Sequence, residues 1–197
     1  MSYYDNHAER FIQDTLHVDM SPIYERFLQH FKGNTLIDIG CGPGRDIKHF
    51  CNLGYDVTGV EPSSVLRQFA KNYTQTEIIE STVQALRIST QFDGIWACAS
   101  LLHISSDELP MAFSNIAQIV KPNGVIYCSF KHGEFEGVKN GRFFNFRTID
   151  SLKAILPGSL TVVEHWITSD QRKDRSDEWL NVIISAKPAT TRPPLRR

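Results

Sequence analysis

Short apolar runs alternate with stretches of helical periodicity from residue 35 onward, and this alternation constrains the fold more than any other feature of the chain. The expected strands are Thr35–Ile39, Asp56–Val60, Glu77–Ile79, Phe92–Ala99 and Gly124–Phe130. The expected helices between them are 44–53, 63–71 and 106–120. Strands that are apolar on both faces and alternate with helices predict an α/β fold, in which a parallel sheet is covered by helices on both faces.

The segments after the fifth expected strand predict a different arrangement. Residues 132–147 are rich in glycine and aromatic side chains and are predicted to form a loop, followed by a helix over 148–156. Two last strands are expected, Leu160–Thr168 and Trp179–Ala186. No helix of useful length separates them, so they are predicted to pair antiparallel. The sheet should therefore have seven strands, mostly parallel, with an antiparallel C-terminal strand.

Length and local charge divide the chain into three parts. Its 197 residues suffice for one domain with a small lid. Helices expected within residues 5–31 would form an N-terminal helical lid over 1–33, and the main domain would cover 34–187. The segment 188–197 has basic residues and prolines but no acidic residue, and it is predicted to be a disordered basic tail.

Composition excludes several classes of protein. The chain has 21 Lys and Arg against 22 Asp and Glu, which gives a formal net charge of -1 and excludes a polybasic surface over the whole molecule. Its 4 cysteines form no C-x-x-C pair, so no zinc or other metal site is predicted. The N-terminus lacks the features of a signal peptide, and no apolar run is long enough to span a bilayer. We expect a cytoplasmic monomer or homodimer without membrane contact.

The segment Leu36–Asp46 reads Leu-Ile-Asp-Ile-Gly-Cys-Gly-Pro-Gly-Arg-Asp, and it joins an expected strand to an expected helix. Glycines are needed where the backbone turns sharply or a ligand lies against it, and free N–H groups at a helix start favour an anion or a polar ligand tail. A dinucleotide-binding loop has the spacing G-x-G-x-x-G, whereas the position three after Gly42 is Arg45. The acid before the first glycine, Asp38, would repel a pyrophosphate and suits an ammonium group. A nicotinamide-dependent oxidoreductase is therefore disfavoured.

The second expected strand leads to Glu61, which lies about 20 residues beyond the first glycine. A carboxylate at this strand tip is placed to accept hydrogen bonds from both hydroxyls of a ribose. It also disfavours a ligand with a 2′-phosphate. Asp38 and Glu61 together predict a nucleoside ligand whose tail carries a positive charge.

With these motifs in this order, residues 34–187 resemble the class I S-adenosylmethionine-dependent methyltransferases. The resemblance implies a Rossmann-like fold with S-adenosyl-L-methionine as the cofactor, a lid that includes Tyr4 and Arg10, and an adenine-contacting turn at Ser81–Leu86. It also implies that Asp38 and the glycines line the methionine end of the site and that Glu61 holds the ribose. The residues expected to bind the cofactor are Tyr4, Arg10, Asp38, Gly40, Cys41, Gly42, Gly44, Arg45, Asp46, Glu61, Pro62, Ser63, Thr82, Val83, Gln84, Ala99 and Ser100.

His103 is the titratable side chain at the tip of the fourth strand, and the ordinary pKa range of a histidine suits a general base. Many methyl transfers need no base, because the sulfonium is already a reactive methyl donor. Alignment of the reacting atoms and exclusion of water then account for catalysis. The alternative role for His103 is to cap the following helix or to pack under the lid. We predict direct in-line transfer without a covalent enzyme intermediate or a metal.

Two segments are predicted to face the substrate. Lys131 and Arg142 accompany aromatic residues after the fifth strand, which suits an anionic or planar substrate. Arg172 and Arg175 lie in the segment between the last two strands. The alternatives are aromatic packing for the first segment and a solvated hairpin for the second.

The leading hypothesis is a methyltransferase that acts on a small-molecule acceptor, because the charge is near zero and the length leaves no room for a separate nucleic-acid-binding domain. A methyltransferase for tRNA or another nucleic acid stays open. It requires the basic tail, Lys131, Arg142 and Arg172 to form one patch that binds phosphates. A non-catalytic subunit that binds the cofactor without turnover is the third reading.

Overall fold

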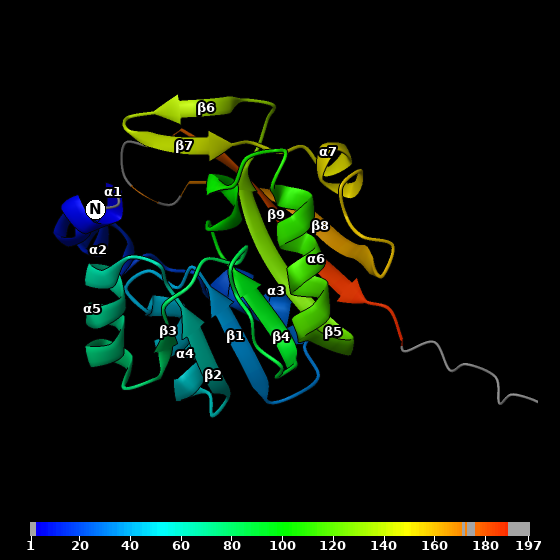
Figure 1. Ribbon diagram of the computed structural model, residues 1–197, viewed down its shortest axis with the longest axis horizontal. Coiled ribbons are helices and arrows are strands. Elements are labelled where there is room, and N and C mark those ends of the chain that lie inside the picture. Colours follow the sequence, from blue (N-terminus) through cyan, green and yellow to red (C-terminus); the bar gives the residue numbers. More distant parts are fainter. Residues whose placement is uncertain (1–2, 171, 173–175, 189–197) are drawn as a thin grey trace, which may run out of the picture.

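A seven-stranded sheet forms the centre of the computed structural model, which describes residues 3–170, 172 and 176–188 (Figure 1). Its strands are β1 (Thr35–Ile39), β2 (Asp56–Val60), β3 (Ile78–Ile79), β4 (Phe92–Ala97), β5 (Val120–Lys131), β8 (Leu160–Ser169) and β9 (Glu178–Ala186). Their order is β3-β2-β1-β4-β5-β9-β8. The strands from β3 to β5 are parallel, whereas β9 is antiparallel to both β5 and β8. The predicted seven-stranded, mostly parallel sheet is confirmed.

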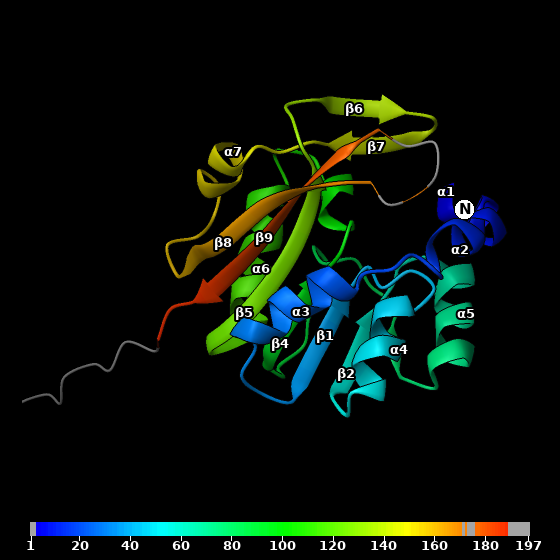
Figure 2. The same cartoon turned by 180° about the vertical axis from the view of Figure 1, so that it is seen from behind.

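Helices cover both faces of this sheet (Figures 1 and 2). One face is covered by α3 (Ser21–His30) and α4 (Arg45–Asn52), with α5 (Ser64–Thr74) beside them, and the other by α6 (Leu109–Ile119) and α7 (Ile149–Lys153). Successive side chains of a strand point to opposite faces. β1 therefore sends Leu36 into one buried cluster with Trp96, and Ile37 into the other with Phe113.

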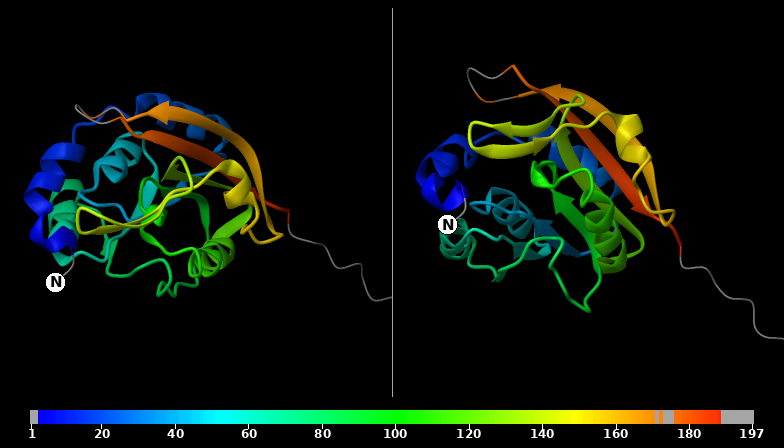
Figure 3. Two further views of the ribbon diagram at one scale, coloured as in Figure 1. Left: turned by 90° about the horizontal axis from the view of Figure 1, so that it is seen from above. Right: turned by 45° about the horizontal axis from the view of Figure 1, so that its top comes forward.

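The N-terminal helices divide between the core and the cover of the sheet edge. α3 buries Tyr24 and Phe27 against Phe50 and Trp96, so it belongs to the core. α1 (Tyr3–Asn6) and α2 (Ala8–Thr15) lie beside α5 at the edge where the parallel strands end (Figure 3). α1 and α2 therefore lie over this edge of the sheet, whereas α3 packs mainly in the core.

The prediction of a loop over 132–147 is wrong, because this segment contains a β-hairpin. β6 (Glu136–Lys139) and β7 (Arg142–Asn145) pair antiparallel as a separate two-stranded sheet. Asn140 and Gly141 between them have φ values of 51° and 76°, as the two-residue turn that joins tightly twisted strands requires. The tip of the hairpin reaches α1, since a Cβ atom on Gly141 would lie 3.4 Å from the ring of Tyr3.

The other predicted elements are present, with shifted ends. α6 begins at Leu109 with Pro110 in its first turn, where a proline needs no hydrogen-bond partner. β5 begins at Val120, and a register shift against β4 accommodates Asn123, whose φ is 63°. Within the described residues, no helix has both the length and the apolar character that crossing a membrane requires. Most of the predicted basic tail, residues 189–197, lies outside the described residues.

Candidate active site

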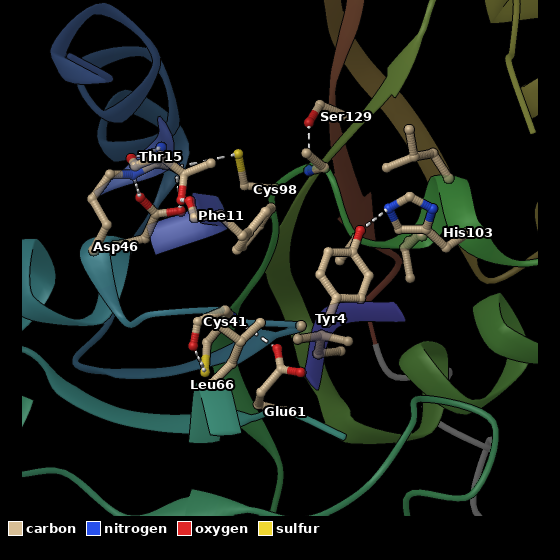
Figure 4. A pocket seen from close by; sticks show the side chains of 18 of the residues that line it. Tyr4, Phe11, Thr15, Cys41, Asp46, Glu61, Leu66, Cys98, His103 and Ser129 are labelled. Carbon is tan, nitrogen blue, oxygen red and sulfur yellow. Dashed lines mark hydrogen bonds and ion pairs between the residues drawn. The ribbon is translucent and has the colours of Figure 1, made fainter. Parts of the chain in front are cut away.

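A cavity of about 360 Å³ lies at the carboxyl ends of the parallel strands (Figure 4). This edge is where open α/β sheets bind their ligands. The loops after β1, β2 and β4 line the floor of the cavity, and Tyr4, Phe11 and Thr15 of the two N-terminal helices cover it. The ring centroids of Tyr4 and Phe11 are 5.1 Å apart in an edge-to-face contact, which gives the cover a packed aromatic surface.

The glycine loop after β1 adopts a conformation that only glycine tolerates well. Gly40, Gly42 and Gly44 have φ values of 72°, 54° and 86°, in the left-handed region where a Cβ atom is strained. A Cβ atom on Gly40 would also lie 2.5 Å from Cβ of Ser100. The loop therefore brings bare backbone to the cavity wall.

The N–H groups of Gly40, Cys41, Gly42 and Gly44 in this loop are engaged within the protein. Those of Gly40 and Cys41 donate to the carbonyl of Val60, and that of Gly44 donates to the carbonyl of Cys41. The N–H of Gly42 donates to Oε2 of Glu61 at 2.9 Å. These internal bonds leave no array of loop donors for an anion and favour a ligand held by carboxylates.

Asp38 is a buried carboxylate with an unused oxygen. It is 2% exposed on β1, and its Oδ2 has no hydrogen-bond partner. Burial and the negative charges of Asp46 and Glu61 raise the pKa of Asp38 well above its usual range, although Arg45 opposes them. An ammonium group would supply both the missing hydrogen bond and the missing positive charge.

Glu61 lies at the tip of β2 with both carboxylate oxygens engaged by backbone. In addition to the bond from Gly42, the N–H of Ser63 donates to Oε1 at 2.8 Å. Each carboxylate oxygen can accept about two hydrogen bonds, so each keeps capacity for a ligand hydroxyl. Burial raises the pKa of Glu61, while the two backbone donors oppose the rise.

Asp46 is the centre of a buried polar network. It accepts hydrogen bonds from the hydroxyl of Tyr24 and from Nε1 of Trp96, the latter at 2.8 Å. Arg45 pairs with the same carboxylate at 2.6 Å and donates to the carbonyl of Thr15 at 3.2 Å. Burial alone would raise the pKa of Asp46, but Arg45 and the donated hydrogen bonds hold it below its usual range. The network therefore ties the glycine loop to the end of α2.

His103 joins three parts of the site. Its Nδ1 lies 2.7 Å from the carbonyl of Phe143 in the hairpin, and its Nε2 lies 2.6 Å from the hydroxyl of Tyr4 (Figure 4). Since a carbonyl only accepts, Nδ1 carries the proton and Nε2 accepts from Tyr4. Burial and the positive charges of Arg142 and Lys131 lower the pKa of His103 to about 4, although the bond to Phe143 opposes the fall.

A turn after β3 lines a further part of the cavity with Thr82, Val83 and Gln84. Nδ2 of Asn115 on α6 donates to the carbonyls of Val83 and Gln84, each at 3.0 Å. A side chain distant in sequence thus holds the turn in place. Only the folded arrangement of α6 reveals this role.

The predicted substrate-side cations differ in their partners. Lys131 lies 2.5 Å from Asp177, and Arg172 lies 2.5 Å from Asp170. Arg142 forms no ion pair with any residue that the structure describes. Its guanidinium instead lies over aromatic rings.

Most of the predicted site residues come together in one place. Those that line the cavity are Tyr4, Gly40, Cys41, Gly42, Arg45, Asp46, Glu61, Pro62, Thr82, Val83, Gln84, Ala99, Ser100, His103, Lys131, Arg142 and Arg172. Asp38, Gly44 and Ser63 are buried beneath the lining residues. Ser63 caps α5 by accepting from the N–H of Leu66, and its hydroxyl donates to Asp5 of α1.

The remaining predicted site residues are Arg10 and Arg175. The side chain of Arg10 is 82% exposed and pairs with Asp14 at 3.8 Å, so the structure does not bring it to the cavity. Arg175 lies outside the described residues.

Further lining residues come from the two segments predicted to face the substrate. Asp170 and Trp179 meet across the β8–β9 pair, where Nε1 of Trp179 donates to Oδ2 of Asp170 at 3.2 Å. Phe144 lines the cavity from β7. The positions of these side chains depend on strand register, which the local sequence does not reveal. For Phe144 there is a partial signal, because Asn140-Gly141 is typical of a hairpin turn and places Phe144 near the start of a strand.

The fold is that of an α/β domain with a ligand cavity at its sheet edge, and comparisons with known proteins give its relatives. The family model described as a methyltransferase domain matches residues 37–128. An uncharacterized methyltransferase of Alkaliphilus oremlandii is 25% identical over 167 residues, which cover 77% of this chain and 76% of that one. The mitochondrial ubiquinone biosynthesis O-methyltransferase of Schizosaccharomyces pombe is 25% identical over 161 residues. That match covers 76% of this chain but only 56% of the relative.

A solved structure shares the architecture. It is the 1,6-didemethyltoxoflavin-N1-methyltransferase of Burkholderia thailandensis with bound 1,6-didemethyltoxoflavin and S-adenosylhomocysteine, at a TM-score of 0.71 and 19% identity. The match covers 93% of this chain and 84% of that structure. These matches support a class I S-adenosylmethionine-dependent methyltransferase, with S-adenosyl-L-methionine as the cofactor.

The residues of the cavity fit this cofactor. The unpartnered oxygen of Asp38 suits an ammonium group, and the remaining acceptor capacity of Glu61 suits hydroxyl groups. The bare backbone at Gly40 and Gly42 allows a ligand to approach closely.

Proposed function

We propose that this methyltransferase transfers a methyl group to a small-molecule acceptor by direct in-line displacement. The observation that carries the proposal is the concave cavity of about 360 Å³, which side chains of α1 and α2 cover in part. Ligand pockets of small molecules are concave and largely enclosed, whereas a nucleic acid needs an open groove. The names of the yeast relative and of the Burkholderia structure, which concern small molecules, support the same class.

Each part of the cofactor is matched by a residue or turn that can bind it. Asp38 binds the ammonium of the methionine end, Glu61 accepts from the ribose hydroxyls, and the turn Thr82–Gln84 contacts the adenine. When bound, the cofactor supplies a methyl group on a positively charged sulfur. The covering side chains of Tyr4 and Phe11 exclude water from the cavity and limit hydrolysis.

His103 acts as a positioning residue in this proposal rather than as a strong base. With a pKa of about 4 it is neutral at pH 7, and its Nε2 is occupied by Tyr4. A base this weak draws a proton from an alcohol poorly. His103 therefore holds its own proton at Nδ1 and fixes Tyr4 over the cavity, while alignment of the acceptor provides the catalysis.

The nucleic-acid alternative has less support among the described residues. It requires unpaired cations, but Lys131 and Arg172 are each matched by an aspartate. A surface of this kind presents little positive charge to a phosphate backbone.

Methyl-labelled S-adenosylmethionine tests the proposal when it is supplied with separate small-molecule and RNA fractions of a cell extract. We expect label in the small-molecule fraction with the wild-type protein and much less with Glu61→Gln. Label that appears in RNA and disappears after ribonuclease treatment would contradict the proposal. Tight binding of S-adenosylhomocysteine with no label in either fraction would point instead to a non-catalytic subunit.

A further inference from the structure

Arg142 differs from the other cations of the cavity in having no counter-charge among the residues that the structure describes. Arg45 pairs with Asp46, Lys131 with Asp177, and Arg172 with Asp170. No described carboxylate lies within ion-pair distance of Arg142, and its buried Nε atom has no hydrogen-bond partner. A partly buried guanidinium with an unused donor is costly unless a ligand supplies the acceptor.

The surroundings fix this guanidinium rather than leaving it mobile. Its Cζ atom lies 5.3 Å from the ring centroid of Tyr3 and 5.0 Å from that of Phe144. The Asn140-Gly141 turn sets the register of the hairpin, in which Arg142 is opposite Lys139. Arg142 lines the cavity, whereas Lys139 does not. The hairpin thus points one of two neighbouring cations at the site.

Charge and shape at this end of the cavity define a ligand class. Among the described residues, Lys131 and Arg172 are each balanced by an aspartate and His103 is neutral, so Arg142 leaves an excess of one positive charge. Phe144, Tyr4 and Trp179 present flat apolar surfaces nearby. Arginine binds a carboxylate through two parallel N–H···O bonds.

We propose that the methyl acceptor is a planar small molecule with one negative charge, of the aromatic carboxylate class, and that Arg142 binds its anionic group. This inference rests on the proposed function, since it identifies the acceptor of the same site. It assigns the choice of acceptor to the β6–β7 hairpin, outside the parallel sheet that carries the cofactor residues.

The test compares benzoate with benzamide, which are of similar shape but differ in charge, on protein saturated with S-adenosylhomocysteine. Ligand-observed NMR titrations give both affinities. We expect benzoate to bind the wild-type protein at least about tenfold more tightly than benzamide, as a charge-assisted hydrogen bond implies. Arg142→Gln should abolish this preference, and Arg142→Lys should retain part of it.

Lys139→Gln is the matched control, because it removes a positive charge from the same hairpin without touching the cavity. It should keep the preference for benzoate. Equal binding of benzoate and benzamide, equal losses in the two glutamine variants, or no saturable binding of benzoate at millimolar concentrations would each overturn the inference. If S-adenosylhomocysteine itself failed to bind, the proposed function would fail. Cofactor binding without a charge preference would overturn only the role of Arg142.

Discussion

The hydroxyl of Tyr4 donates a hydrogen bond of 2.6 Å to Nε2 of His103, a residue 99 positions further along the chain. The same imidazole donates from Nδ1 to Phe143. One ring therefore links the covering helix α1, the tip of β4 and the β6–β7 hairpin. The direction of the bond depends on the neutral form of this histidine, because a protonated Nε2 would donate to the Tyr4 hydroxyl instead of accepting from it.

Tyr4→Phe removes this hydrogen bond and keeps the ring that packs on Phe11. We expect protease cleavage within α1 and α2 to become about fivefold faster in the cofactor-free protein, since one hydrogen bond contributes about 1 kcal/mol. S-adenosylhomocysteine should slow cleavage in the wild type. The exposed Tyr73→Phe is the control and should leave the rate unchanged. Equal cleavage rates with and without S-adenosylhomocysteine would rule out a lid that orders on cofactor binding.

The protonation of His103 makes stability depend on pH in a defined direction. Its pKa is about 4 in the folded protein and about 6.5 in an unfolded chain. Between these values only the unfolded chain binds the proton, so the stability from this group is complete above about pH 6.5 and falls as the pH decreases toward 4. Urea unfolding of wild type and His103→Asn should show a difference in stability that shrinks over this interval.

An NMR titration checks the same claim directly. The His103 ring signals should not shift between about pH 8 and 5.5, whereas in denatured protein they should titrate near 6.5. A midpoint near 6.5 in the folded protein would contradict the described burial.

Asp46→Asn removes the counter-charge of Arg45 inside the network of Tyr24 and Trp96. The buried guanidinium is then unpaired, and we expect a loss of about 3 kcal/mol or more in the free energy of unfolding. Asp14→Asn breaks only the exposed pair with Arg10 and should cost less than about 1 kcal/mol. Chemical denaturation of both variants measures the contrast. Equal small losses would mean that the Asp46 network contributes little to the fold.

Gly40→Ala combines a positive φ with a steric clash, whereas Gly54→Ala has a positive φ of 90° and open space around its Cβ position. Gly54→Ala should cost about 1 kcal/mol through backbone strain alone. Gly40→Ala should cost more and weaken S-adenosylhomocysteine binding, because Ser100 must move. Thermal melting compares the stability of the two variants, and calorimetry compares their affinity for S-adenosylhomocysteine. Equal losses of stability with unchanged affinity would argue against a tight loop at the cavity wall.

Local patterns were enough to predict the parallel part of the fold. The run of apolar residues before Asp38, the glycines that follow and the acid at the end of β2 all lie within single strand–loop units. The prediction that these residues bind a cofactor depends only on their spacing along the chain, which can be read from the sequence. The sheet and the glycine loop could therefore be predicted closely.

Relations between distant segments could not be predicted in this way. The partners of Asp46 come from α3 and β4, and Asn115 of α6 holds the turn after β3. The folded structure pairs Lys131 and Arg172 with aspartates and leaves Arg142 without an ion-pair partner among the described residues. The β6–β7 hairpin is an exception, because Asn140-Gly141 is a local sequence signal for a hairpin turn, although this segment was predicted to be a loop.

The most direct measurement is a calorimetric titration of S-adenosylhomocysteine into wild type and Asp38→Asn at several pH values. Burial, Asp46 and Glu61 raise the pKa of Asp38 in the free protein, and an ammonium group lowers it again on binding. Binding should therefore release protons, and affinity should rise with pH until Asp38 is ionised in the free protein. We predict one site per wild-type chain with this behaviour, and for Asp38→Asn an affinity at least about tenfold lower without proton release. Equal affinity and equal proton release in the two proteins would contradict a cofactor site built on Asp38.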